Sequence, residues 1–489
     1  MQMNPAAKAL SAFTRLPLLA FALLTATLFW VGGLTPPMQA PDEGTHLLRA
    51  YAVSKGRWLP STPPGHMTGD MVDSQFLEYG LAGTYEWLEE PGRLTEQRLG
   101  HLAAMRWHPD GSEVFFESPG AAYYAPLVYI PHAVGLAAGR WLDLTIQSSV
   151  EWARLLANAT TAALLVAAFV FWRPPLVVVG MLLLPMTLSQ AGAPTIDGIT
   201  TGALLLGLSL FARFYAEQRR MPPAHAAMFF VCLTVCMTSR VHTLVLMALP
   251  FLLYLRTRQR AMAAMGAAAA LIALAWTAFA AWATVDLRKP RAISTLDALQ
   301  GLLAAPADFV HLLFNTLASP ERQQQYAQSF IGVVGWANSL PSHYYPVFWW
   351  GLAALMLLSL RKWTPEFPLV RIALIAMALA SAVFIFLALA LTFTDPGADT
   401  IDGVQGRYFL PSAIMLATGI FWRHVPLTGS RTSDMPRPTS WLPIASAAVF
   451  AMASLSVLVG VLENRFEPIA AAQPSDHLAT QGEQRRPWQ

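Results

Sequence analysis

The chain has 489 residues, of which 55% are hydrophobic and only 12% are charged, and its formal net charge is +3. A soluble domain usually carries about twice that charged fraction, so the composition excludes a water-soluble enzyme, a secreted disulfide scaffold and a DNA-binding protein. The mean hydropathy of +0.43 agrees with this. Apolar runs recur along the chain, and roughly 17 to 25 such residues cross a bilayer. The sequence therefore predicts an all-α polytopic membrane protein.

The first apolar run, 16–34, follows a short basic N-terminus. We interpret it as an uncleaved span rather than a signal peptide, because it is long and no good cleavage site follows it. The positive-inside rule places the later basic clusters around Arg213, Arg256, Arg361 and Arg423 in the cytoplasm. Counting between these clusters predicts eleven spans, with the C-terminus outside. They are 16–34, 150–172, 175–193, 197–216, 224–239, 241–255, 261–284, 343–360, 369–392, 407–422 and 440–461.

Two outer segments are too long to be simple connectors. The first contains the apolar run 121–139. If this run crossed the membrane, every later basic cluster would lie on the outer side, against the positive-inside rule. We therefore expect a helix that lies on, or dips into, the outer membrane surface. In the second, helical spacing over Ile293–Leu317 predicts another surface helix, which carries Asp297, Asp308 and His311. The predicted organisation is a cytoplasmic N-terminus with the first span (1–35), a first outer segment (36–149), a central bundle (150–284), a second outer segment (285–342), C-terminal helices (343–461) and a disordered outer tail (462–489).

An acidic motif follows the first span directly. If a helix begins near Pro41, Asp42 and His46 lie four residues apart on one face, Glu43 and His46 lie three apart, and Arg49 continues the stripe. Two adjacent carboxylates raise each other's proton affinity, which suits one of them to act as a general base. Acidic residues also favour the first turn of any helix, so simple capping remains an alternative.

Other charged residues stand at the predicted outer ends of later spans. Arg154 opens the second span and could bind a phosphate or extend to the membrane interface. Asp197 opens another span, as a cap or as a carboxylate facing the same chamber. Arg240 and His242 stand at an outer turn and could hold an anionic headgroup. Each of these signals is weak alone.

The segment Asp402–Pro411 enters a span from outside and is more informative. Arg407 is expected at the phosphate depth of the outer leaflet, with Gly403 and Gly406 permitting close backbone approach. A second aromatic and glycine-rich stretch includes Trp336. It could form a stacking platform for a sugar, although aromatic residues also form ordinary interfacial belts.

Together these motifs resemble a bacterial family of multispanning proteins of unknown function that is often met among surface-polysaccharide genes. The resemblance covers about residues 15 to 460. It rests on P-D-E-x-x-H at 41–46, Tyr124–Leu127, the Gly-x-x-Gly-Trp…Leu-Pro stretch at 332–341, and Gln405–Pro411. That family is similar to the GT-C membrane glycosyltransferases.

The resemblance implies a sugar donor linked to a polyprenyl phosphate or pyrophosphate, used on the periplasmic face of the bacterial inner membrane. It implies that Asp42 or Glu43 is the catalytic base. It also implies a supporting role for Asp197, and the helical spacing to Asp42 and Glu43 suggests a supporting role for His46. Expected donor-phosphate contacts are Arg154, Arg240, His242 and Arg407, and expected sugar or acceptor contacts are Tyr124, Trp336, Gln405 and Tyr408. A lysine expected near Arg240 and His242 is missing, which puts phosphate binding there in doubt.

The sequence thus predicts an inverting glycosyltransferase acting on a glycan, a lipid-linked oligosaccharide or a protein, with no nucleic-acid partner. No cluster has metal-ligand spacing, so no cofactor is assigned and a divalent metal stays open. Alternatives are a transporter or flippase of a lipid-linked saccharide, and a non-catalytic assembly factor for envelope glycans. A transporter typically shows internal repeats, and none is evident.

Overall fold

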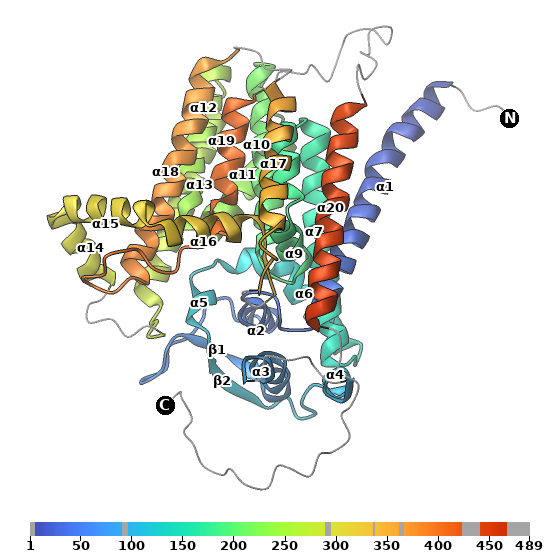
Figure 1. Ribbon diagram of the computed structural model, residues 1–489, viewed down its shortest axis with the longest axis vertical. Coiled ribbons are helices and arrows are strands. Elements are labelled where there is room, and N and C mark those ends of the chain that lie inside the picture. Colours follow the sequence, from blue (N-terminus) through green and yellow to red (C-terminus); the bar gives the residue numbers. More distant parts are fainter. Residues whose placement is uncertain are drawn as a thin grey trace.

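The computed structural model describes residues 5–89, 96–288, 295–335, 338–360, 366–422 and 441–466. The long helices stand side by side in a bundle, and shorter helices with a small sheet gather at one end of it (Figure 1). The helices and short turns of the bundle are α1 (Pro5–Gly33), α7 (Ile146–Phe171), α8 (Leu176–Leu182), α9 (Pro185–Gly192), α10 (Asp197–Ala216), α11 (Pro223–Ser239), the 3₁₀ helix Val241–Met247, α12 (Ala248–Thr257), α13 (Arg260–Ala283), α17 (Tyr344–Leu360), α18 (Pro368–Thr392), the 3₁₀ helix Gly406–Phe409, α19 (Leu410–Ile420) and α20 (Leu442–Phe466).

Six helices in the described part of the chain are long and apolar enough to cross a membrane, and a bent helix pair would make a seventh. The six lie in α1, α7, α10, α13, α18 and α20. The other runs that we predicted as spans form shorter helices, so the count of eleven stays a prediction. The clearest difference is at 175–193, which is two helices because Leu184 is extended and Pro185 starts α9. An all-α membrane protein is nevertheless confirmed.

The first outer segment forms a cap at one end of the bundle. Strand β1 (Gly69–Asp73) pairs antiparallel with β2 (Glu113–Glu117), from Gly69 opposite Glu117 to Asp73 opposite Glu113. The run 121–139 is broken before Pro126, where Ala125 is extended, so it contains no helix long enough to span. The helices of the cap are α2 (Glu43–Ser54), α3 (Ser74–Glu89), α4 (Glu96–Ala104), α5 (Pro119–Ala122), the 3₁₀ helix Pro126–Tyr129 and α6 (Ile130–Trp141).

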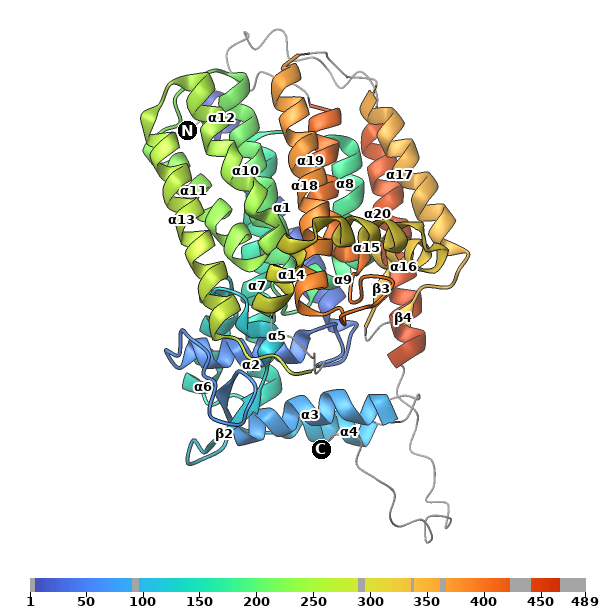
Figure 2. The same ribbon diagram turned by 90° about the vertical axis from the view of Figure 1, so that its left-hand side faces the viewer.

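The second outer segment lies across the long helices (Figure 2). Its elements are α14 (Thr295–Ala304), α15 (Pro306–Ala318), α16 (Pro320–Ile331) and the two-residue strands β3 (Val333–Val334) and β4 (Asn338–Ser339). Our single surface helix over Ile293–Leu317 is wrong, because α14 and α15 meet at an angle of 98°. Proline disfavours helical geometry in the residue before it, and Ala305 accordingly has φ −134° and ψ 69°.

Close glycine contacts fix the elements that surround the site. A Cβ on Gly32 of α1 would lie 2.2 Å from the carbonyl oxygen of Gly192 in α9, so the two backbones touch. A Cβ on Gly406 would lie 2.1 Å from the carbonyl oxygen of Tyr326 in α16. The expected close approach at Gly406 is therefore real, and its partner is α16. Gly403 serves the turn before it, at φ +75°.

Candidate functional site

Asp42 lies just before α2 and does not cap it. Its backbone is left-handed, with φ 64° and ψ 4°, and its side chain makes no capping hydrogen bond. The helix begins at Glu43, two residues after Pro41, so a start near Pro41 is confirmed. The Asp42 carboxylate is 52% exposed and accepts a 2.5 Å hydrogen bond from Nη2 of Arg407. A non-glycine residue held at positive φ beside a charged partner is typical of a functional position.

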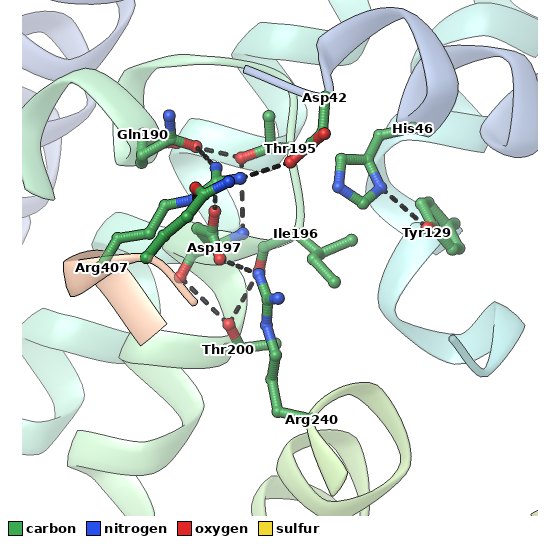
Figure 3. Close-up of polar contacts among 11 residues, drawn as sticks. Asp42, His46, Tyr129, Gln190, Thr195, Ile196, Asp197, Thr200, Arg240 and Arg407 are labelled. Atoms are coloured by element: carbon green, nitrogen blue, oxygen red, sulfur yellow. Dashed lines mark hydrogen bonds and ion pairs between the residues drawn. The ribbon is translucent and has the colours of Figure 1, made fainter. Parts of the chain in front are cut away.

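Arg407 is held from several directions. Its Nε donates to Gln405 at 2.8 Å and its Nη1 donates to Gln190 at 3.2 Å. Nη1 also lies 3.6 Å from the carboxylate of Asp197. Figure 3 shows Asp42 and Asp197 both turned toward this guanidinium. With only 8% of its side chain exposed, Arg407 is a buried cation with its orientation fixed.

Asp197 joins a second arginine to the same cluster. Arg240 donates to the Asp197 carboxylate (Figure 3). The guanidinium of Arg240 also lies 5.5 Å from the ring centre of Tyr124 and 5.9 Å from that of Tyr408. Aromatic faces attract such cations and fix their orientation. Asp197 therefore faces the chamber, and Tyr124 and Tyr408, two predicted sugar contacts, lie beside Arg240.

Glu43 points away from Asp42 toward another arginine. It is 1% exposed, accepts a hydrogen bond from the backbone nitrogen of Ala40 at 3.1 Å, and lies 3.5 Å from Nη2 of Arg154. Burial raises the pKa of Glu43, against the opposing charge of Arg154. For Asp42, desolvation is the largest single influence and would raise the pKa, but the nearby charges, led by Arg407, and the hydrogen bond from Arg407 together outweigh it and hold this pKa below its usual value. Our expectation that both carboxylates gain proton affinity is wrong for Asp42.

The predicted stripe along α2 does not converge on one point. Nδ1 of His46 lies 2.8 Å from the Tyr129 hydroxyl (Figure 3), and burial lowers the pKa of His46 to about 4. Arg49 is buried and pairs with Asp70 of β1 at 3.2 Å, which anchors α2 to the cap. His46 is therefore a neutral neighbour of the acidic cluster, and Arg49 has a structural partner elsewhere.

Two polar cavities in the described part of the chain meet at Met186 and Arg407. The smaller, of about 50 Å³, is called the arginine pocket and includes Gln190, Asp197, Arg240, His242, Arg407 and Tyr408 in its lining. The larger, of about 420 Å³, is called the glutamine cleft and includes Asp42, Gln324, Gln325, Gln328, Gln405 and Arg407. Arg407 thus separates a cationic compartment from one that Asp42 faces.

An apolar cavity of about 470 Å³, called the lateral groove, adjoins the arginine pocket. Its lining comes mainly from aliphatic side chains of α1, α7, α8 and α9, including Leu24, Leu165 and Leu182. Thr187, Ala191 and Thr201 line both the lateral groove and the arginine pocket. The site therefore joins an apolar channel along the bundle to two guanidinium groups.

The structure gathers most of the predicted residues. Asp42, Asp197, Arg240, Arg407, Gln405 and Tyr408 lie in one network, and His242 lines the arginine pocket. Arg154 stands behind Glu43 and lines neither polar cavity. Trp336 lies outside the described residues. Among the residues described, no group of three or more His, Cys, Asp or Glu side chains could hold a metal ion.

Sequence reasoning missed Gln190 and one face of α16. Gln190 is a single amide within an apolar run, which is a signal that could have found it. On α16, Glu321, Gln324, Gln325 and Gln328 follow the spacing i, i+3, i+4, i+7 and share one face. A polar stripe at helical spacing beside an apolar segment is readable from sequence, but its position next to Asp42 is not.

Comparison with known proteins identifies one family. A family model described as predicted membrane protein (DUF2142) matches residues 24–416, which is most of the chain and includes every member of the site network. No curated protein matches the sequence. The family description states a membrane location and names no activity.

Proposed function

This chain belongs to the DUF2142 family of predicted membrane proteins, and we propose that it is a membrane glycosyltransferase of the GT-C type. It would transfer a sugar from a polyprenyl-phosphate-linked donor to an acceptor hydroxyl on the periplasmic face of a bacterial inner membrane. The observation that carries the proposal is the Asp42–Arg407 pair, which stands where the arginine pocket and the glutamine cleft meet, with the lateral groove adjoining the pocket.

The donor would occupy the lateral groove and the arginine pocket together. A polyprenyl chain needs an apolar channel, and the groove between α1, α7, α8 and α9 supplies one. A phosphate needs charged donors, and Arg240 and Arg407 face the pocket that this channel adjoins. Three residues shared by both cavities make the path continuous. This arrangement supports a lipid phosphate better than a free nucleotide sugar.

In the transfer step, the acceptor oxygen attacks the anomeric carbon of the donor from the cleft side. The bond between that carbon and the phosphate oxygen breaks, and the polyprenyl phosphate leaves with the electron pair. The carboxylate of Asp42 takes the proton of the attacking hydroxyl. A single displacement of this kind inverts the anomeric carbon. General-base assistance typically contributes about 10²–10⁴ in rate.

The ion pair couples proton transfer to departure of the phosphate. In the resting site, Arg407 is neutralised by Asp42 at 2.5 Å and by Asp197 at 3.6 Å. When Asp42 takes up the proton, it loses its charge, and Arg407 is released to stabilise the second negative charge that develops on the phosphate. Stabilisation that grows only as the reaction proceeds lowers the barrier rather than tightening substrate binding.

The ends of α10 support a periplasmic orientation of the site. Asp197 lies in the first turn of this helix and Arg213 in its last turn, 20 residues that span about 30 Å. Basic residues favour the cytoplasmic end of a span. The Asp197 end, with Asp42 and Arg407 beside it, then faces the periplasm.

Asp42→Asn tests the proposal in cells that lack the native gene. We expect mass spectrometry of the surface glycans to show a missing sugar in the deletion strain, its return with the wild-type chain, and no return with Asp42→Asn. Asp143→Asn is the matched control, because Asp143 lies in the same outer segment with its side chain 96% exposed. If Asp42→Asn restores normal glycan modification at equal membrane abundance, Asp42 is not the catalytic base. A transporter needs no base and would then explain the site better.

A further inference from the structure

The glutamine cleft has a lining unlike that of the arginine pocket. One face of α16 forms its wall with Glu321, Gln324, Gln325 and Gln328. Across from this wall stand Asp42, Gln405 and Arg407. Helix α16 is held against the Arg407 segment, since the backbone nitrogen of Gly406 donates to Ser329 at 2.7 Å. The backbone that carries these glutamines is therefore fixed relative to the Arg407 segment.

The polar side chains of α16 divide by the side they face. Away from the cleft, Arg322 pairs with Asp402 at 2.6 Å, and Gln323 donates to the carbonyl of Leu317 at 2.7 Å. Within the described part of the chain, the amides of Gln324, Gln325 and Gln328 make no such bond. Each amide offers one acceptor and two donors to a ligand in the cleft.

The charges of the cleft disfavour an anion. Asp42 and Glu321 both contribute carboxylates to the lining. Its guanidinium, Arg407, is already engaged by Asp42 and Asp197. An acidic ligand would meet two like charges without a free cation, whereas a neutral ligand rich in hydroxyl groups would meet the donors and acceptors that it can satisfy.

We propose that the glutamine cleft is the acceptor site, and that it binds the acceptor as a neutral saccharide whose hydroxyl groups are bonded by Gln324, Gln325 and Gln328. This proposal rests on the proposed transferase function and specifies its second substrate. The reacting hydroxyl lies toward Asp42, while the donor phosphate lies on the opposite side of Arg407. A volume of about 420 Å³ is ample for a monosaccharide unit. A serine or threonine of a protein offers one hydroxyl and would leave most amides unsatisfied.

The test is the double substitution Gln325→Leu with Gln328→Leu, made in the full chain. The two lost bonds to neutral hydroxyl groups should lower the modified surface glycan about tenfold, which corresponds to about 1.4 kcal/mol. Gln323→Leu is the control on the same helix, because its amide bonds to Leu317, and it should leave modification unchanged. Purified variants should bind undecaprenyl phosphate in detergent micelles as tightly as the wild type, which also shows that they are folded.

Three results would overturn the acceptor assignment. The first is normal glycan modification by the double variant. The second is that the double variant also loses undecaprenyl phosphate binding. The third is glycan analysis showing that the added sugar is attached to a protein or to an acidic sugar. Gln328→Asn provides a milder second variant, expected to retain intermediate modification. If the deletion strain lacks no sugar at all, the transferase function itself fails, and that outcome is distinct from each of the other three.

Discussion

The chemistry at the residue scale depends on which arginine each carboxylate meets. Asp42 and Glu43 are neighbours in sequence, yet Asp42 meets Arg407 and Glu43 meets Arg154. Their pKa values move in opposite directions, because burial dominates at Glu43 while the surrounding charges and the Arg407 hydrogen bond together dominate at Asp42. Asp42 is half exposed and faces the cleft, whereas Glu43 is buried and bonds the backbone that leads into α2. Asp42 is therefore the carboxylate that a ligand in the cleft can reach in its ionised form, although its lowered pKa makes it the weaker base of the two, and Glu43 holds the position of Asp42.

His46 gives the site a pH dependence that can be measured through stability. Its pKa of about 4 in the folded chain lies below the usual value near 6.5, so the unfolded chain binds more protons between these pH values. The contribution of the neutral His46 ring to the free energy of unfolding is fully present above pH 6.5. It decreases as the pH falls toward 4, by up to about 3 kcal/mol. We expect the melting temperature of the solubilised protein to fall between pH 7 and pH 4.5.

The matched comparison is His46→Gln, which has no titrating ring. Its melting temperature should fall less over the same pH interval than that of the wild type. Equal falls for the two proteins would show that His46 is not the group responsible. A variant that is merely destabilised lowers both values together and leaves their difference unchanged.

At the scale of elements, α16 and the Arg407 segment act as one unit. A Cβ at position 406 would lie 2.1 Å from the carbonyl oxygen of Tyr326 and 2.3 Å from the backbone nitrogen of Phe330. Both atoms belong to backbone that cannot rotate away. A change at this contact therefore moves Arg407 and the glutamine face of α16 relative to each other.

Gly406→Ala should weaken undecaprenyl phosphate binding and lower the melting temperature, with a stability loss of about 1–3 kcal/mol from overpacking. Gly301→Ala is the control, because Gly301 also lies in the second outer segment and a Cβ there would meet no atom within 4 Å. Undiminished binding by Gly406→Ala would show that the spacing between α16 and Arg407 does not matter to the donor.

For the whole molecule, the orientation in the membrane is the property to test. Ser112 lies in the cap, and Gln218 follows the basic end of α10; both are exposed. We expect Ser112→Cys to react with a membrane-impermeant maleimide in spheroplasts, and Gln218→Cys to react only after permeabilisation. The native Cys232 and Cys236 are buried, so the unmodified chain is the low-background control. The reverse labelling pattern would place the site in the cytoplasm.

The sequence predicted features that depend on neighbouring residues better than it predicted contacts between segments that are far apart in the chain. Composition and apolar runs act locally, and the membrane class that they indicate is confirmed. Asp42, Asp197, Arg240 and Arg407 were each identified, but their pairing is set by packing between segments that lie from 43 to 365 residues apart in the sequence. Helical spacing failed at Asp42, because the chain there turns left-handed before α2 begins.

The helices of the second outer segment also show that a local sequence pattern does not reveal the direction of the chain. Apolar spacing over Ile293–Leu317 is genuinely helical on both sides of Ala305, so the pattern alone gave one helix. Pro306 changes the direction of the chain by 98° without disturbing that pattern. The glutamine face of α16 was readable as a stripe, but its meaning depends on Gly406 and Asp42, which reach it only in the folded chain.

The left-handed backbone of Asp42 has a consequence for engineering this protein. Glycine adopts φ 64° without the penalty of about 1 kcal/mol that a residue with a side chain incurs there. Replacing Asp42 by glycine would therefore relieve this backbone penalty, but it would also remove the carboxylate that bonds the buried Arg407 at 2.5 Å. Hardier variants of this chain should be sought with that codon held fixed.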